Sequence, residues 1–171
     1  NGSLYIDNVL FAVDLDKVSA NYEVKNGTKV IAGSVFNRCQ ALEKIVLPDS
    51  LLSIGAYAFS NCNSLKEVAF SDSLVSIGPD AFSHCYYLEE VKMPTTVKSL
   101  GQGAFFQCYR LKKAEIGSLI ECGYHVFVGC DNLTNVSFSD GAEVVGGYMF
   151  DGCKKLKTVS LSDSIERIGD G

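Results

Sequence analysis

Cysteine and histidine are the residue types in this chain that could carry nucleophilic or metal chemistry. The 171 residues include seven cysteines and two histidines, His84 and His125. An adjacent pair such as His84 and Cys85 could form a base and a nucleophile, and converging cysteines could form disulfides or bind zinc. Six of the cysteines recur at nearly equal intervals, at Cys39, Cys62, Cys85, Cys108, Cys130 and Cys153.

This regular spacing argues against metal and disulfide chemistry. Zinc sites usually draw on Cys-x-x-Cys pairs, and the sequence has none. A disulfide needs Cβ atoms about 3.8 Å apart with converging directions, which parallel positions along a stack do not have. We therefore expect a ladder of buried free thiols, each able to reach a backbone carbonyl. Cys122 lies outside the ladder and is expected to be another core filler.

Other signatures of catalysis are also missing from the sequence. There is no acid pair, glycine-rich phosphate loop or nucleophile elbow. Within the adjacent pair, Cys85 is expected to lie in the core and His84 to point outward. The sequence therefore predicts a protein that is not an enzyme and that uses no metal or cofactor.

The cysteines belong to a repeat that organises the whole chain. The octet AFSNCNSL, residues 58–65, recurs in variant forms with Phe, Cys and Leu at fixed spacing. Successive copies start 23 residues apart, with one interval of 22. A fixed period in the range of roughly 20 to 50 residues is the signature of stacked repeats. The phenylalanines of the frame are Phe36, Phe59, Phe82, Phe105, Phe127 and Phe150.

Each repeat predicts a strand, a turn, a second extended piece and one helical turn. In LEKIVLP, from Leu42, the alternation places Ile45 and Leu47 on one face of a strand that ends at Pro48. The A-F-x-x-C segment is expected to form the helical turn, with Phe and Cys inside. A glycine before it is expected at a tight corner, where a Cβ would clash or a positive φ is needed: Gly55, Gly78, Gly101, Gly123, Gly146 and Gly169.

The pattern L-x-x-[IV]-x-[LF] followed by a turn resembles a leucine-rich repeat. The 23-residue form, with A-F-x-x-C before the strand and I-G after it, resembles the BspA-like (Treponema-type) leucine-rich repeats. The resemblance implies an α/β, right-handed solenoid with a curved parallel sheet, short helical turns and about six repeats. Hydroxyl residues or glycine stand where ordinary leucine-rich repeats have asparagine: Ser50, Ser73, Thr96, Gly141 and Ser164.

We expect a single leucine-rich-repeat domain over residues 1–171. Residues 1–21 fit the repeat poorly and predict a hairpin, which is either an N-terminal cap or an insertion within an array. Repeats occupy residues 22–171, and the last is incomplete because the chain stops at ERIGDG. We therefore also expect the chain to be a piece of a longer protein.

Composition excludes two classes of partner. The formal net charge is −5, and no basic footprint of the kind that nucleic acid requires is present. No apolar run approaches the roughly 18 to 20 residues that a membrane span needs. We expect neither nucleic-acid binding nor a membrane-spanning segment.

The outward residues of the predicted strands form the candidate binding surface. This face has no aromatic row and no dominant charge, and changes from charged to small hydroxylic residues along the chain. A second group, Tyr86, Tyr109 and Arg110, is interpreted either as a recognition patch or as cover for the edge of the core. The strand-face residues are Lys44, Val46, Glu67, Ala69, Glu90, Lys92, Lys113, Glu115, Asn135, Ser137, Thr158 and Ser160.

The family resemblance implies a location and a role. BspA-like proteins are typically surface or secreted proteins of bacteria and of some mucosal protists, and several act as adhesins. We therefore expect a non-enzymatic binding or adhesion module, extracellular or at the cell surface, whose ligand is a protein or glycoprotein of the host matrix or another cell. The alternative is a passive structural spacer within a larger surface protein. The sequence does not identify the ligand or the oligomeric state.

Overall fold

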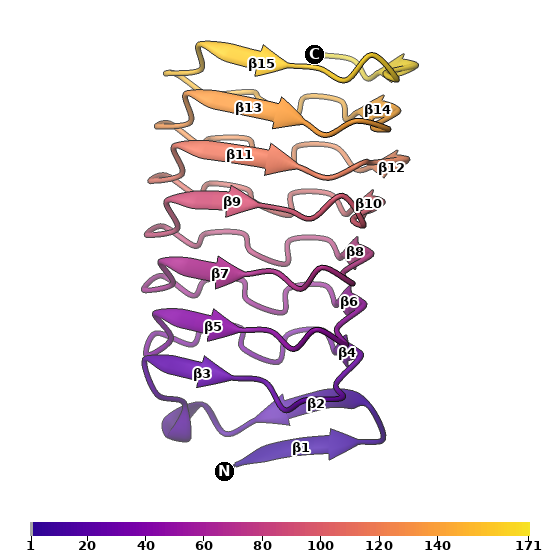
Figure 1. Cartoon of the computed structure of the whole chain (residues 1–171). Coiled ribbons are helices and arrows are strands. Elements are labelled where there is room, and N and C mark those ends of the chain that lie inside the picture. Colours follow the sequence, from indigo (N-terminus) through magenta and orange to yellow (C-terminus); the bar gives the residue numbers. More distant parts are fainter. Residues whose placement is uncertain (1) are drawn as a thin grey trace.

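The structure, a computed structural model, describes residues 2–171 as a solenoid of stacked turns (Figure 1). Each turn places one longer strand on one side of the solenoid and a two-residue strand on the other. The predicted solenoid of 23-residue repeats is therefore confirmed. The one helix among the described residues is a short 3-10 helix, η1 (Leu15–Lys17).

The longer strands form two parallel sheets. One contains β3 (Asn21–Glu23), β5 (Lys44–Val46) and β7 (Glu67–Ala69). The other contains β9 (Glu90–Lys92), β11 (Lys113–Ile116), β13 (Asn135–Phe138) and β15 (Thr158–Ser160). Equivalent repeat positions pair across the sheet, as Ile45 does with Val68 and Ala114 with Val136. Each side chain therefore lies directly beside its counterpart in the next repeat.

The shorter strands form the opposite side. One sheet runs through β1 (Ser3–Ile6), β2 (Val9–Val13), β4 (Val30–Ile31), β6 (Ser53–Ile54), β8 (Ser76–Ile77), β10 (Ser99–Leu100) and β12 (Glu121–Cys122). The last pair is β14 (Val144–Val145) with β16 (Arg167–Ile168). Only β1 is antiparallel, forming with β2 the hairpin expected near the N-terminus. Strand β2 then pairs in parallel with β4, so the hairpin covers that end of the core.

The core is a column of stacked phenylalanine rings between the two sides. Neighbouring ring centroids from Phe36 to Phe127 lie 5.0 to 5.5 Å apart with nearly parallel planes. These rings are fully buried. One repeat of about 23 residues cannot offset the entropy of its own ordering, so each turn is stabilised by burial against its neighbours.

The expectation of a helical turn in the A-F-x-x-C segment is wrong. The segment is an irregular turn in which some backbone N–H groups donate to the next repeat rather than within their own turn. Phe59 N–H donates to the Ala81 carbonyl (2.7 Å), whereas Cys62 N–H donates to the Phe59 carbonyl (3.2 Å). Tyr57 and Asn61 take left-handed φ angles of 57° and 60°. Bonds to the neighbouring repeat therefore replace the hydrogen bonds that a helix would make internally.

The corner glycines are required by close packing and not by backbone φ. None of them is among the described residues with positive φ. A Cβ on Gly55 would lie 2.6 Å from the nitrogen of Gly33, and one on Gly78 would lie 2.7 Å from the nitrogen of Ala56. The backbones of successive corners thus approach more closely than a side chain allows.

The longer strands are interrupted between β7 and β9, where no ladder joins the two sheets within the described chain. On the short-strand side the same two turns remain paired through β8 and β10. Phe70 follows β7 and packs edge-on against Phe82, with ring centroids 5.7 Å apart. We call this interruption the seam.

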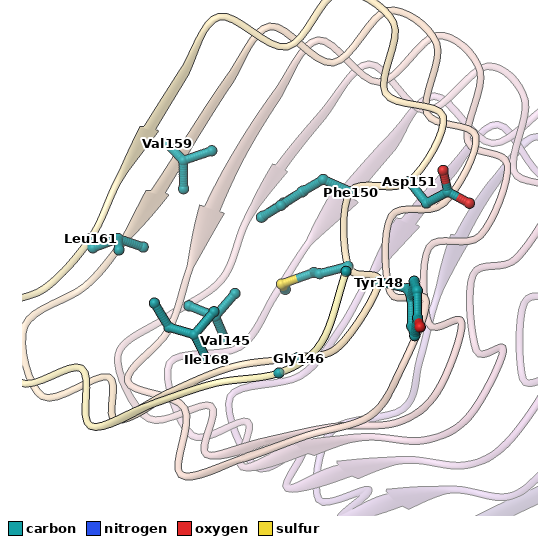
Figure 2. A pocket seen from close by; sticks show the side chains of 11 residues that line it. Val145, Gly146, Tyr148, Phe150, Asp151, Val159, Leu161 and Ile168 are labelled. Atoms are coloured by element: carbon teal, nitrogen blue, oxygen red, sulfur yellow. The ribbon is translucent and has the colours of Figure 1, made fainter.

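The interior of the last turn is open at the C-terminal end. Figure 2 shows Val159, Leu161 and Ile168 around this opening, with Phe150 pointing into it and Tyr148 at its outer edge. Ile168 is 67% exposed and Leu161 46%, although their counterparts in earlier turns are buried or half-buried. The face is therefore a cross-section of the apolar core.

Substitution of Gly78 by alanine tests the close approach of the corners. We expect Gly78→Ala to lower the free energy of unfolding by at least about 2 kcal/mol, because the new methyl overlaps backbone atoms that cannot rotate away. Urea denaturation measures the change. The control is Ser99→Ala on a neighbouring short strand, expected to change stability by less than about 0.5 kcal/mol. Equal effects of the two substitutions would contradict the steric explanation.

Candidate functional site

The cysteine ladder forms the predicted contacts with backbone carbonyls. Five of the six ladder thiols donate to the carbonyl of the phenylalanine in the preceding repeat: Cys62 to Phe36 (3.0 Å), and Cys85, Cys108, Cys130 and Cys153 to Phe59, Phe82, Phe105 and Phe127 (each 3.2 Å). All seven cysteines are free thiols. The ladder is thus part of the packing between repeats.

Burial makes these thiols poor nucleophiles. It raises the pKa of Cys62 to about 12, of Cys122 to about 11 and of Cys153 to about 12. Cys85 shifts in the same direction for the same reason. The thiolate is the reactive form of a cysteine. Because the pKa values are so high, hardly any thiolate exists at neutral pH.

The adjacent residues His84 and Cys85 do not act together. The Cys85 thiol donates to the Phe59 carbonyl, whereas the half-buried His84 ring packs against Phe106 and Tyr86 at centroid distances of 5.5 and 5.9 Å. Among residues 2–171, no group of three or more His, Cys, Asp or Glu side chains is arranged to hold a metal ion.

The predicted strand-face residues share one side of the solenoid. Lys44, Glu115 and Ser137 are half-exposed, and the others are exposed. Strand-face residues at equivalent positions of neighbouring turns lie side by side. The face is therefore a continuous surface along each of the two long-strand sheets.

Ion pairs and hydrogen bonds between turns neutralise much of the polar character of this face. Lys44 pairs with Glu67 at 2.7 Å, and Lys92 lies 3.6 Å from Glu115. A hydrogen bond from Lys113 holds the pKa of Glu115 below its ordinary value, so this carboxylate stays charged at neutral pH. The face therefore presents charges of both signs and no field of a single sign.

The tyrosine group is a genuine cluster on a different part of the surface. The rings of Tyr86 and Tyr109 stack at 5.0 Å with 20° between their planes. The Arg110 guanidinium lies 4.0 Å from the centroid of the Tyr87 ring. These residues directly follow the ladder cysteines Cys85 and Cys108. Their spacing was the signal for the cluster, but the sequence did not reveal that a groove lies beside it.

This groove, which we call the tyrosine groove, spans the fourth to sixth repeats and has a volume of about 490 Å³. Its walls come from positions just before and just after the ladder cysteines. The lining residues are Gln107, Tyr109, Val128, Gly129, Asp131, Gly152 and Lys154.

Comparison with protein families decides the identity of the repeat. The model described as "BspA type Leucine rich repeat region" matches six copies over residues 16–122 and 120–171. The chain belongs to the BspA-type leucine-rich repeat family. A comparison with curated protein sequences finds no significant match.

Solved structures of bacterial proteins share the fold of this BspA-type chain. A leucine-rich repeat protein of T. pallidum is 24% identical, with a TM-score of 0.84, over 95% of this chain and 77% of that one. A leucine rich cell surface protein of Faecalibacterium prausnitzii is 23% identical, with a TM-score of 0.66, over 90% of this chain and 35% of that one. A leucine-rich repeat protein of Bacteroides ovatus is 26% identical, with a TM-score of 0.63, over 88% and 45%. The chain thus spans less than half the length of the last two.

One of these neighbours, the Faecalibacterium prausnitzii protein, is described as a cell surface protein. Within residues 2–171, the structure has no helix with the length and apolar character needed to cross a membrane.

The buried thiols predict a steep loss of stability in alkaline solution. An unfolded thiol ionises above pH about 9, whereas a folded ladder thiol such as Cys62 keeps its proton to about 12. Unfolding then releases protons, so each such thiol lowers the free energy of unfolding by about 1.4 kcal/mol per pH unit above pH about 9. The stability contributed by the buried, protonated thiols is fully present below that pH and is lost as the pH rises.

Urea denaturation between neutral pH and pH about 10 measures this slope. We expect Cys85→Ala to flatten it relative to the unsubstituted chain, and the exposed-tyrosine control Tyr124→Phe to leave it nearly unchanged. A slope that survives removal of Cys85 intact would show that this buried thiol does not contribute to it.

Proposed function

We propose that this chain is a non-enzymatic binding or adhesion module of an extracellular or cell-surface protein. Its ligand on this proposal is a protein or glycoprotein of the host matrix or of another cell. The observation that carries the proposal is the outward face of the long strands, a broad surface on one side of the solenoid that two parallel sheets of three and four strands form. Solenoids commonly bind extended partners on such faces.

The chemistry of the face supports a macromolecular ligand. Lys44, Glu67, Lys92 and Glu115 are already paired between turns, so a small ion of either sign gains little from them. Val46 is 40% exposed among the polar residues and provides apolar contact area near the N-terminal end of the face. Mixed polar and apolar character over a broad area is typical of surfaces that bind other proteins.

The high pKa values of the buried thiols support the non-enzymatic part of the proposal. The ladder cysteines use their S–H groups in packing, which leaves them unsuited to nucleophilic attack.

A binding array with two matched sets of variants tests the proposed surface. The probes are immobilised extracellular-matrix proteins, mucins and fixed microbial cells. The first set combines Glu67→Ala, Glu90→Ala and Lys113→Ala on the long-strand face. The control set combines Lys98→Ala, Glu121→Ala and Glu166→Ala near the short strands. We expect only the first set to weaken binding, by about tenfold or more, because removed interface contacts raise the dissociation constant.

The same array separates binding from a spacer role. A passive spacer would give no binding to any probe, or binding that neither set of variants changes. Both sets should keep the thermal stability of the parent chain, since exposed ion pairs contribute little to it.

A further inference from the structure

The tyrosine groove exists because two repeats lack a side chain that the others carry. The residue before each ladder cysteine occupies an equivalent position in every turn. It is Arg38, Asn61, His84 and Gln107 in four successive repeats, and then Gly129 and Gly152. These residues all take positive φ, so the backbone is the same with and without a side chain. The two glycines therefore leave a hollow where the earlier turns are filled.

One wall of the hollow is an aromatic ring. Tyr86 from the preceding repeat stacks on Tyr109, and the groove lies on the side of the following repeats. Tyr109 is also one of the residues that line the groove, so part of its ring borders it. The ring is 38% exposed, and Asn132 holds its backbone by donating to the Tyr109 carbonyl at 2.6 Å. The wall is thus both exposed and fixed in place.

The other walls provide hydrogen-bonding groups of both kinds. Asp131 and Lys154 pair at 2.8 Å across neighbouring turns. The Gln107 side chain lies beside Gly129, with its Nε2 4.0 Å from where a Cβ on Gly129 would stand. Together they offer acceptor oxygens and donor nitrogens within one groove. Because the carboxylate and the ammonium are paired, the site carries no uncompensated charge. Val128 is the one aliphatic side chain in the lining, which gives little room for an apolar peptide anchor.

This combination matches the surface of a sugar ring. A pyranose has an apolar face of C–H groups, which packs on an aromatic ring, and a rim of hydroxyls that both donate and accept hydrogen bonds. We propose that the tyrosine groove binds a neutral pyranose residue of a glycan, with its C–H face on Tyr109 and its hydroxyls bonded to Gln107, Asp131 and Lys154. The site is separate from the long-strand face and does not depend on the function proposed for that face.

Filling the groove gives the sharpest test. Gly152→Asn restores the side chain that Asn61 provides in an earlier turn at a similar φ, 60° against 70°. A Cβ at residue 152 would have ordinary contacts of 3.4 Å or more, so this variant should fold. Tyr109→Ala removes the aromatic wall instead. The matched controls are Gly141→Asn, an exposed left-handed glycine outside the groove, and Tyr124→Ala, an exposed tyrosine outside the groove.

The probes are methyl glycosides of glucose, galactose, mannose and N-acetylglucosamine, titrated into the labelled chain and followed by amide chemical shifts. We expect at least one glycoside to shift the signals of Gly129 and Gly152 selectively. Gly152→Asn and Tyr109→Ala should weaken its binding by about tenfold or more, and both controls should leave it unchanged.

Three results would overturn the proposal: no glycoside binding at millimolar concentration, binding that Gly152→Asn leaves intact, or a groove that takes a protein ligand and no sugar. The matrix-protein array has no bearing on this outcome, because its variants lie on the long-strand face. Failure of one proposal therefore leaves the other standing.

Discussion

The close stacking of one repeat on the next is the constraint from which the rest of this structure follows. Phenylalanine rings can form a dry column only if successive turns approach to about the 5.0 Å seen between Phe36 and Phe59. That approach leaves no room for a Cβ at the corners, which accounts for Gly55 and Gly78. It also brings each thiol, such as that of Cys62, against a carbonyl of the neighbouring turn. The recurring Phe and Cys positions of the octet are thus those that the stacking of repeats requires.

Much of the fold was predictable because the same condition is repeated along the chain. Alternation placed Ile45 inward and Lys44 outward, and the structure agrees. The helical turn predicted for the A-F-x-x-C segment is wrong because the spacing of its Phe and Cys fits a helical turn and the observed irregular turn equally well. Its conformation is decided instead by N–H groups such as that of Phe59, which donate to the next repeat. The residue pattern within one repeat does not show which N–H groups donate to the next repeat.

The surface was less predictable than the core. The strand face could be assigned from alternation alone, since every second side chain of a strand points outward. The tyrosine groove could not, because it depends on what is missing at Gly129 and Gly152 and on residues from three turns. Tyr86 and Tyr109 were visible in the sequence as neighbours in the repeat. Their stacking geometry belongs to the assembled solenoid.

The seam divides the long-strand side of the solenoid without dividing its other sides. Between β7 and β9 the long strands share no ladder in the described chain, whereas β8 and β10 remain paired behind them. The A-F-x-x-C segments also join these two turns, as where the Phe82 N–H donates to the Ala104 carbonyl at 2.8 Å. Every other junction of the long strands has a ladder of backbone bonds. Among the long-strand junctions of the described chain, the seam is therefore the one without a ladder, and it divides the face into two separately hydrogen-bonded blocks that meet at Phe70.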